Sequence, residues 1–258
     1  MTDTTQMDIA ARALPLVDLT NLDEACGKAD IDALCARAVT PHGTVAAVCV
    51  WPRFVAQAAS NLAGSGVGVA TVVNFPDGGE DTNAVLQETR KAVGEGADEI
   101  DLVMPWRAFV SGRRGFAETQ VARVREACGD RLLKVILETG EIEDALLIHV
   151  ASNMAIAAGA DFIKTSTGKV RVNATLQAAE IMLTAIEERR REDGREVGFK
   201  PAGGIRTLED AGAYLALADR LLGQNWVSAA HFRFGASGLL DALLAVLDGT
   251  AAASGEGY

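Results

Sequence analysis

The chain has 258 residues, of which 49% are hydrophobic, 5% aromatic and 23% charged. This composition is typical of a globular protein, and the length fits two small domains or one large α/β domain. The 35 acidic residues outnumber the 24 basic ones and give a net charge of −11. A general nucleic-acid or membrane-surface binder needs a basic surface, so this balance argues against both classes of partner.

Cysteine and histidine usage indicates neither a metal site nor a disulfide framework. The four cysteines form no CxxC pair, and the three histidines are spread along the chain without ligand spacing. The amino-terminal stretch MTDTTQMDIAARALPLV lacks the basic start and long apolar core of a signal peptide. No apolar run approaches the roughly 20 residues that span a bilayer. We therefore expect a cytoplasmic protein without metal, membrane or nucleic-acid partners.

Short β-branched runs alternate with longer segments of helical periodicity along the chain. Strands are predicted at residues 14–19, 45–50, 69–75, 99–104, 132–138, 161–166, 197–203 and 231–237. The intervening segments carry apolar residues at three- and four-residue intervals, and one helix start shows the capping pair Thr207 and Asp210. No linker interrupts the alternation, so we predict a single domain over residues 1–258, with about 249–258 as a mobile tail.

The number and order of these elements predict an α/β fold of the (β/α)8 TIM-barrel type. Eight strands, each followed by a helix, in about 250 residues fit this barrel better than an open doubly wound sheet. A G-x-G-x-x-G loop, which such a sheet usually carries near its start, does not follow the first strand. In a barrel, chemistry is expected at the carboxyl ends of the strands and phosphate binding after the seventh and eighth strands.

Side-chain alternation within the strands predicts buried charges inside the barrel. In several strands one set of alternate positions is apolar and suits the helix-facing side, while the opposite set carries charge. The inward sets include Asp101, Lys134, Lys164 and Lys200. An uncompensated charge there costs several kcal/mol and forces pairing or a shifted pKa.

Three lysines facing one or two carboxylates exceed what a structural salt bridge needs, although a single Lys–Asp pair would most simply fix the barrel. Desolvation and a second cation both favour a neutral amine. A depression of about two to three units from a pKa near 10.4 makes a lysine nucleophilic at neutral pH. The pattern therefore favours Schiff-base chemistry.

Loops rich in glycine follow the last strands. In KPAGGIRT, RFGASGLL and TSTGK, glycine lets backbone N–H groups approach an anion, and a hydroxyl or an amine stands beside it. Each glycine pair alone indicates a tight turn, but their place in the barrel favours a phosphate site. The residues expected to bind substrate phosphate are Thr167, Gly168, Lys169, Gly203, Gly204, Gly235, Ser237 and Gly238.

The motifs DFIKTSTGK, GFKPAGGIRT, ADEIDLVMP, LLKVILETGE and FRFGASGLL, in this spacing, resemble the deoxyribose-phosphate aldolase family. The resemblance runs from about Leu14 to Tyr258 and is specific to that family rather than to barrels in general. It implies a lyase: a class I aldolase without metal or other cofactor. The implied reaction is the reversible cleavage of 2-deoxy-D-ribose 5-phosphate to acetaldehyde and D-glyceraldehyde 3-phosphate.

The resemblance also implies catalytic roles for four residues. Lys164 in FIKTSTGK is implied to be the Schiff-base nucleophile, and Lys200 in GFKPAGG the cation that lowers its pKa and relays protons. Asp101 in DEIDLV is implied to donate and accept protons together with Lys200 and a water molecule. The terminal Tyr258 is implied to reach the site and assist proton transfer, although the composition of the tail does not indicate this.

Three further residues are implied to line the substrate pocket: Asp18 in LVDLT, Cys49 in AAVCVWP and Lys134 in LLKVILETG. For Cys49 the sequence alone favours a small core residue. Gly238 departs from the family pattern, which often has a second serine there, so one hydroxyl for the phosphate is missing.

Two other functions remain open at this point. A class I barrel aldolase for another, larger sugar phosphate would keep Lys164 but accept a different donor. A non-catalytic sugar-phosphate-binding barrel would keep the glycine loops without needing the pair Lys164 and Lys200, so the presence of both lysines weighs against it. The expected partners are a sugar phosphate and acetaldehyde, and the sequence leaves a homodimer open.

Overall fold

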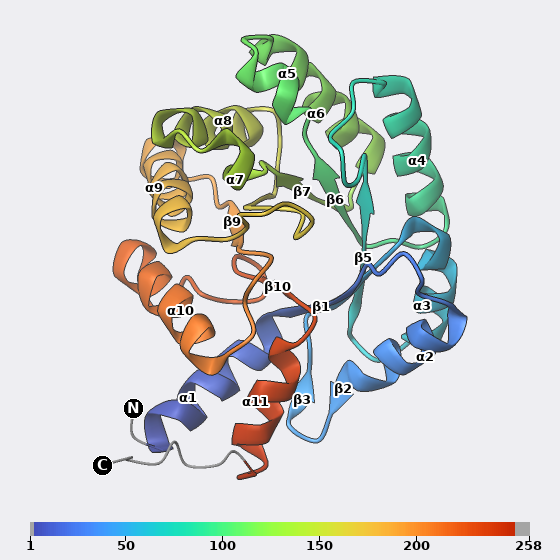
Figure 1. Cartoon of the computed structure of the whole chain (residues 1–258), viewed down its shortest axis with the longest axis vertical. Coiled ribbons are helices and arrows are strands. Elements are labelled where there is room, and N and C mark those ends of the chain that lie inside the picture. The colour runs from blue at the N-terminus through green and yellow to red at the C-terminus, as the bar shows by residue number, and fades with distance from the viewer. Residues whose placement is uncertain (1–2, 251–258) are drawn as a thin grey trace.

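Eight parallel strands form the centre of the structure, a computed structural model that describes residues 3–250 (Figure 1). They follow one another around the sheet in chain order, and the bridges Phe199–Phe232 and Ala202–Gly235 join its two edges. The predicted α/β fold, a (β/α)8 barrel, is thus confirmed. The strands are β1 (Val17–Asn21), β4 (Ala47–Val50), β5 (Gly68–Val73), β6 (Glu99–Val103), β7 (Leu132–Ile136), β8 (Phe162–Lys164), β9 (Gly198–Lys200) and β10 (Phe234–Ala236).

Helices surround the strands, and β6 and β7 are each followed by a short helix before a longer one. At the start of α10 (Leu208–Leu222), Thr207 and Asp210 exchange the predicted capping hydrogen bonds. The other helices are α2 (Lys28–Arg37), α3 (Val55–Asn61), α4 (Thr82–Gly94), α5 (Trp106–Val110), α6 (Arg114–Cys128), α7 (Thr139–Ile142), α8 (Ala145–Ala157), α9 (Leu176–Asp193) and α11 (Leu239–Leu247). None of the helices within residues 3–250 is long and apolar enough to cross a membrane.

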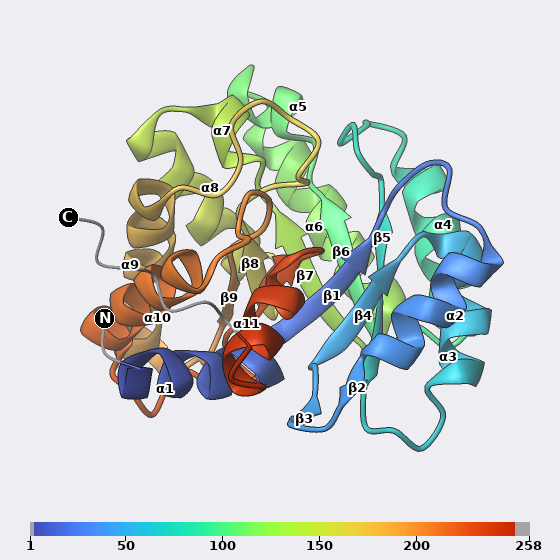
Figure 2. The ribbon, with the colours of Figure 1, turned by 60° about the horizontal axis from the view of Figure 1, so that its bottom comes forward.

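The amino-terminal region contains the main differences from the predicted elements. A helix that was not predicted, α1 (Asp3–Ala13), lies across one end of the barrel against α10 and α11 (Figure 2). The strand expected from residue 14 begins instead at Val17, because Leu14–Leu16 form a 3-10 turn (η1). Pro15 in that turn has a fixed φ and no backbone donor for a ladder. A small hairpin of β2 (Val39–Thr40) and β3 (Gly43–Thr44) was not predicted either.

The strands near the end of the chain are shorter than predicted, and side-chain hydrogen bonds join the backbone ones beyond their ends. Beyond β8, the hydroxyl of Thr165 accepts from the N–H of Ala202 at 3.0 Å. The hydroxyl of Ser166 donates to the carbonyl of Ala202 at 2.9 Å. Together with the backbone bond from Thr165 to Lys200, these bonds hold the segments after β8 and β9 together where the loops begin.

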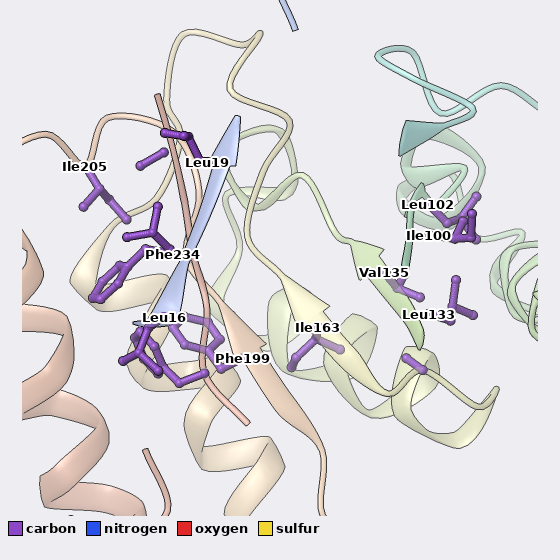
Figure 3. Close-up of a cluster of buried hydrophobic side chains, with 14 of the residues drawn as sticks. Leu16, Leu19, Ile100, Leu102, Leu133, Val135, Ile163, Phe199, Ile205 and Phe234 are labelled. Carbon is purple, nitrogen blue, oxygen red and sulfur yellow. The ribbon is translucent and has the colours of Figure 1, made fainter. Parts of the chain in front are cut away.

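The predicted alternation of the strands is confirmed. Apolar side chains on the outer side of the strands pack against the helices in one large core (Figure 3), with Leu102 and Val135 among them. On the opposite side, Asp101 lies in register with Lys134, and Lys164 lies in register with Lys200. The barrel therefore separates an apolar outer core from a charged interior.

Gly198 in β9 tests how tightly this interior is packed. A Cβ atom at Gly198 would come 2.3 Å from the ring of Phe162, which is buried inside the barrel. We expect Gly198→Ala to lower the free energy of unfolding by about 1–3 kcal/mol, measured by urea denaturation. Gly94→Ala is the matched control, since a Cβ there meets nothing within 4 Å and alanine favours a helix. Equal stability of the two variants would contradict this packing.

Candidate active site

Lys164 ends β8 and points into the barrel, with 3% of its surface exposed. Its amine donates to Oδ2 of Asp101 at 2.7 Å. The same side chain lines a cavity of about 520 Å³ at the carboxyl end of the barrel. Lys164 is therefore held by a buried carboxylate and faces a space large enough for a small molecule.

Asp101 on β6 is the centre of the polar interior. Its Oδ1 accepts from Lys134 at 2.9 Å, and its Oδ2 accepts from both Lys164 and Lys200 at 2.7 Å. Burial alone would raise the pKa of Asp101, but the three ammonium groups outweigh burial and hold this pKa well below its usual value. Asp101 is thus an ionised acceptor shared by Lys164 and Lys200.

The three lysines differ in their pKa shifts although all are buried. Burial is the largest cause that lowers the pKa of Lys164; Asp101 opposes this shift, and the charge of Lys200 adds to it. In Lys200 and Lys134, burial also lowers the pKa, but the nearby carboxylates outweigh it and raise both values. Lys164 alone among these lysines is pushed towards the neutral amine. The charge of Lys200 lowers the pKa of Lys164, as predicted, although burial lowers it more.

The cavity beside Lys164 brings together the loops that were predicted to bind phosphate. Gly203 and Gly204 have φ angles of 85° and 88°, which glycine adopts without strain. Gly238 is not in the described lining and instead caps the amino end of α11. The predicted phosphate residues that line the cavity are Thr167, Gly168, Lys169, Gly203, Gly204, Gly235 and Ser237.

The residues expected to play supporting roles lie deeper than the described cavity wall. Asp18 and Lys134 are fully buried, and Lys134 approaches Asp18 at 3.3 Å. Cys49 is fully buried in a small cluster that includes Ala47 and Ala70, and burial raises the pKa of its thiol. This is the environment of a small core residue. Tyr258 lies outside the described residues.

The alternation of β6 placed Glu99 on the inward side with Asp101 but gave it no role, and Arg233 was not identified from the sequence. Glu99 accepts from Lys134 and, at 2.8 Å, from Arg233. Arg233 also donates to Oδ1 of Asp18 at 2.7 Å. Strand alternation could have predicted the inward direction of Arg233. It stands between Phe232 and Phe234, whose apolar side chains occupy the helix-facing positions. The inward direction predicted for Glu99 is confirmed, since its carboxylate contacts Lys134 and Arg233 inside the barrel.

Glu138 is a further residue that the sequence did not single out. Its φ of 62° is left-handed, and its side chain is fully buried. One carboxyl oxygen accepts from the N–H of Thr167 at 3.1 Å, while the other has no partner within the structure. Burial raises the pKa of this carboxyl. Glu138 therefore holds the start of the loop that carries Lys169.

A lysine with a lowered pKa, an ionised acceptor and a glycine-lined cavity on a (β/α)8 barrel define a class I, Schiff-base-forming aldolase. The chain belongs to the DeoC/LacD family of aldolases, whose profile matches residues 12–244. It is therefore a lyase of the metal-independent class. A lysine Schiff base is the general mechanism of this family.

Individual relatives agree with this assignment. A deoxyribose-phosphate aldolase of Agrobacterium fabrum is 54% identical over 254 residues, which cover 97% of this chain and 96% of the relative. A solved structure of a candidate deoxyribose-phosphate aldolase from Toxoplasma gondii ME49 has a TM-score of 0.84 at 26% identity, and 96% of each chain is covered. Another from Coccidioides immitis has a TM-score of 0.79 at 31% identity, covering 92% of this chain and 85% of that one.

The opposite pKa shifts of Lys164 and Lys200 predict opposite effects on stability. An unfolded lysine titrates near 10.4, so the lowered pKa of the folded Lys164 costs stability at pH values below the unfolded pKa. We expect Lys164→Met to keep or raise the free energy of unfolding at pH 7, by up to about 1 kcal/mol. This advantage should shrink as pH rises towards the unfolded pKa.

Lys200→Met is the matched variant, because it removes an equally buried amine from the adjacent strand. The raised pKa of Lys200 means that its stabilising charge is fully present below the unfolded pKa. The substitution removes one salt-bridge partner from Asp18 and one from Asp101. We expect the free energy of unfolding, measured by urea denaturation at pH 7, to fall by about 3–5 kcal/mol. A greater loss in Lys164→Met than in Lys200→Met would contradict the pKa directions.

Proposed function

We propose that this chain catalyses the reversible cleavage of 2-deoxy-D-ribose 5-phosphate to acetaldehyde and D-glyceraldehyde 3-phosphate. The observation that carries the proposal is the amine of Lys164, which has a lowered pKa, contacts Asp101 and lines the cavity. A neutral amine is the form that attacks an aldehyde. The 54% identical relative from Agrobacterium fabrum carries the name of this activity and supports the substrate assignment.

In this mechanism, Nζ of Lys164 attacks the C1 aldehyde of the open-chain sugar. The resulting carbinolamine loses water and gives a cationic imine. A base then removes the proton of the C3 hydroxyl, the C2–C3 bond breaks, and its electrons move into the imine to give an enamine. Glyceraldehyde phosphate leaves with C3 to C5. Protonation of the enamine at C2 and hydrolysis release acetaldehyde and the free lysine.

Asp101 and Lys200 are assigned the proton transfers around the carbinolamine. Oδ2 of Asp101 accepts from both Lys164 and Lys200 at 2.7 Å, so one oxygen connects the reacting amine with a second proton donor. The raised pKa of Lys200 keeps a proton available, and the lowered pKa of Asp101 keeps its carboxylate ready to accept one. Together with a water molecule they form the proposed relay.

The glycine loops and Lys169 are assigned the substrate phosphate. Backbone N–H groups near Gly204 and the hydroxyl of Ser237 are suited to its oxygens, and both residues are exposed to the cavity. The amine of Lys169 donates to the carbonyl of Leu22 at 2.8 Å, which places its charge at the cavity wall. This local positive site offsets the overall net charge of −11 for an anionic substrate.

The proposal predicts that acetaldehyde forms a trappable imine with Lys164. Incubation with acetaldehyde and borohydride should abolish activity and add one ethyl group, which peptide mass spectrometry should locate at Lys164. Lys164→Leu is the control and should take up no ethyl group in the barrel interior. Trapping of a larger sugar phosphate without trapping of acetaldehyde would instead support an aldolase with a different donor.

Gly238 allows a direct test of the phosphate site. A Cβ at this position meets nothing within 4 Å, so Gly238→Ser should fold without strain and add a hydroxyl beside Ser237. We expect the KM for 2-deoxy-D-ribose 5-phosphate to fall about threefold to tenfold with little change in kcat, as one added hydrogen bond permits. Ser237→Ala should raise the KM by a similar factor.

Unphosphorylated 2-deoxy-D-ribose is the control substrate for this pair of variants. Its kcat/KM should be nearly the same in Gly238→Ser, Ser237→Ala and the unchanged protein. An equal effect on both sugars would place the two residues outside the phosphate site.

Three further expectations concern Tyr258, the location of the protein and its oligomeric state. Tyr258 is assigned the proton that the enamine takes up, on the family resemblance alone. A cytoplasmic location and a homodimer also stay predictions. Truncation after residue 257 tests the role of Tyr258. If Tyr258 delivers that proton, the truncated protein should still form the trappable imine with acetaldehyde but should exchange deuterium into acetaldehyde slowly.

A further inference from the structure

The barrel interior contains more positive than negative groups. Among residues 3–250, its four basic side chains are Lys134, Lys164, Lys200 and Arg233, and the three carboxylates that form salt bridges with them are Asp18, Glu99 and Asp101. Each of these residues is at most 6% exposed, and salt bridges connect them in one network. If all seven were ionised, the network would carry one excess positive charge. Burial of an unbalanced charge is costly, so one basic group is expected to give up its proton.

The contacts indicate which basic group becomes neutral. Lys134 approaches three carboxylates, while Lys200 and Arg233 each bind two. Within the described part of the chain, Lys164 forms a salt bridge with Asp101 alone. Arginine does not lose its proton in proteins. The amine with the fewest carboxylate partners is therefore the one at the cavity.

We propose that Arg233 and Glu99 are positioning residues that set the protonation state of Lys164 through this charge balance, without contacting substrate. The inference rests on the proposed role of Lys164 as the nucleophile. Arg233 supplies a permanent charge to Asp18 and Glu99, and Glu99 in turn pairs with Lys134. Without Arg233, three carboxylates would face only three lysines, and Lys164 would keep its proton.

The other ionisable groups around Lys164 do not replace this pair. Asp101 on β6 and Lys200 on β9 belong to the network already. Cys49 on β4 has a raised pKa and stays a neutral thiol. Glu138 after β7 forms no ion pair with the four basic side chains in the described structure. Burial raises the pKa of Glu138 and favours the neutral acid, outweighing the charge of Lys164, which acts to lower that pKa, so Glu138 is not counted with the three paired carboxylates. The balance therefore depends on the seven interior groups.

The test measures how the reactivity of Lys164 depends on pH. Brief labelling with acetic anhydride, which reacts with neutral amines, is followed at Lys164 by peptide mass spectrometry between pH 5 and 10. Arg233→Met should move the labelling midpoint upward by about one pH unit, because it leaves excess negative charge. Glu99→Gln should move it downward by a similar amount, because it removes negative charge. The acid limb of kcat/KM should shift in the same directions.

Two further variants separate charge from packing. Arg233→Lys keeps the charge but changes the shape, and its midpoint should stay near that of the unchanged protein. The double variant Glu99→Gln/Arg233→Met removes one charge of each sign, and its midpoint should return towards that value. If Arg233→Met does not fold, Glu99→Gln and the double variant still test the balance.

Equal midpoints in all variants would overturn the inference and leave Arg233 and Glu99 as supports of the barrel only. Loss of activity in both single variants without any shift in pH dependence would have the same meaning. Failure of the unchanged protein to trap acetaldehyde is a different result, because it would contradict the proposed function while the labelling midpoints still test the charge balance.

Discussion

Asp101 accepts hydrogen bonds from three lysines on three different strands, and the chemistry of the site depends on this contact. The barrel makes it possible, because strands that curve around one interior direct side chains from β7, β8 and β9 towards the carboxylate on β6. Burial makes every charge in that space expensive unless it is paired. The interior is therefore stable only with its charges arranged in one particular way, and the same arrangement leaves Lys164 with a lowered pKa.

Stability and catalysis make opposite demands on neighbouring residues of this interior. Lys134 and Lys200 stabilise the fold because each pairs with several carboxylates, and their raised pKa values follow from those pairs. Lys164 has one such partner and a lowered pKa, so its burial costs stability and favours the neutral amine. Salt bridges connect Arg233 and Glu99 with Lys134 and, through Asp18, with Lys200. The site is thus a salt-bridge network in which one lysine, Lys164, has a single carboxylate partner among the described residues and faces the cavity.

The loops around the cavity are held by contacts that act at a distance from the substrate. Glu138, in a left-handed conformation, accepts from the N–H of Thr167, and Thr165 and Ser166 tie the end of β8 to Ala202. These contacts fix the segment between Lys164 and Lys169. Lys164 and Lys169 lie on this one short stretch of chain, and both line the cavity.

The sequence by itself determined the barrel, the inward direction of Asp101 and of the lysines, and the loops that line the cavity, because strand alternation and glycine placement are local properties. It did not predict α1 or the start of β1 at Val17, where packing against α10 and α11 and a proline turn decide the structure. Only the tertiary structure decided which carboxylate each lysine binds and that Glu99 and Arg233 complete the network. Those pairings join strands far apart in the chain, and pKa shifts depend on distances and burial that no local pattern contains.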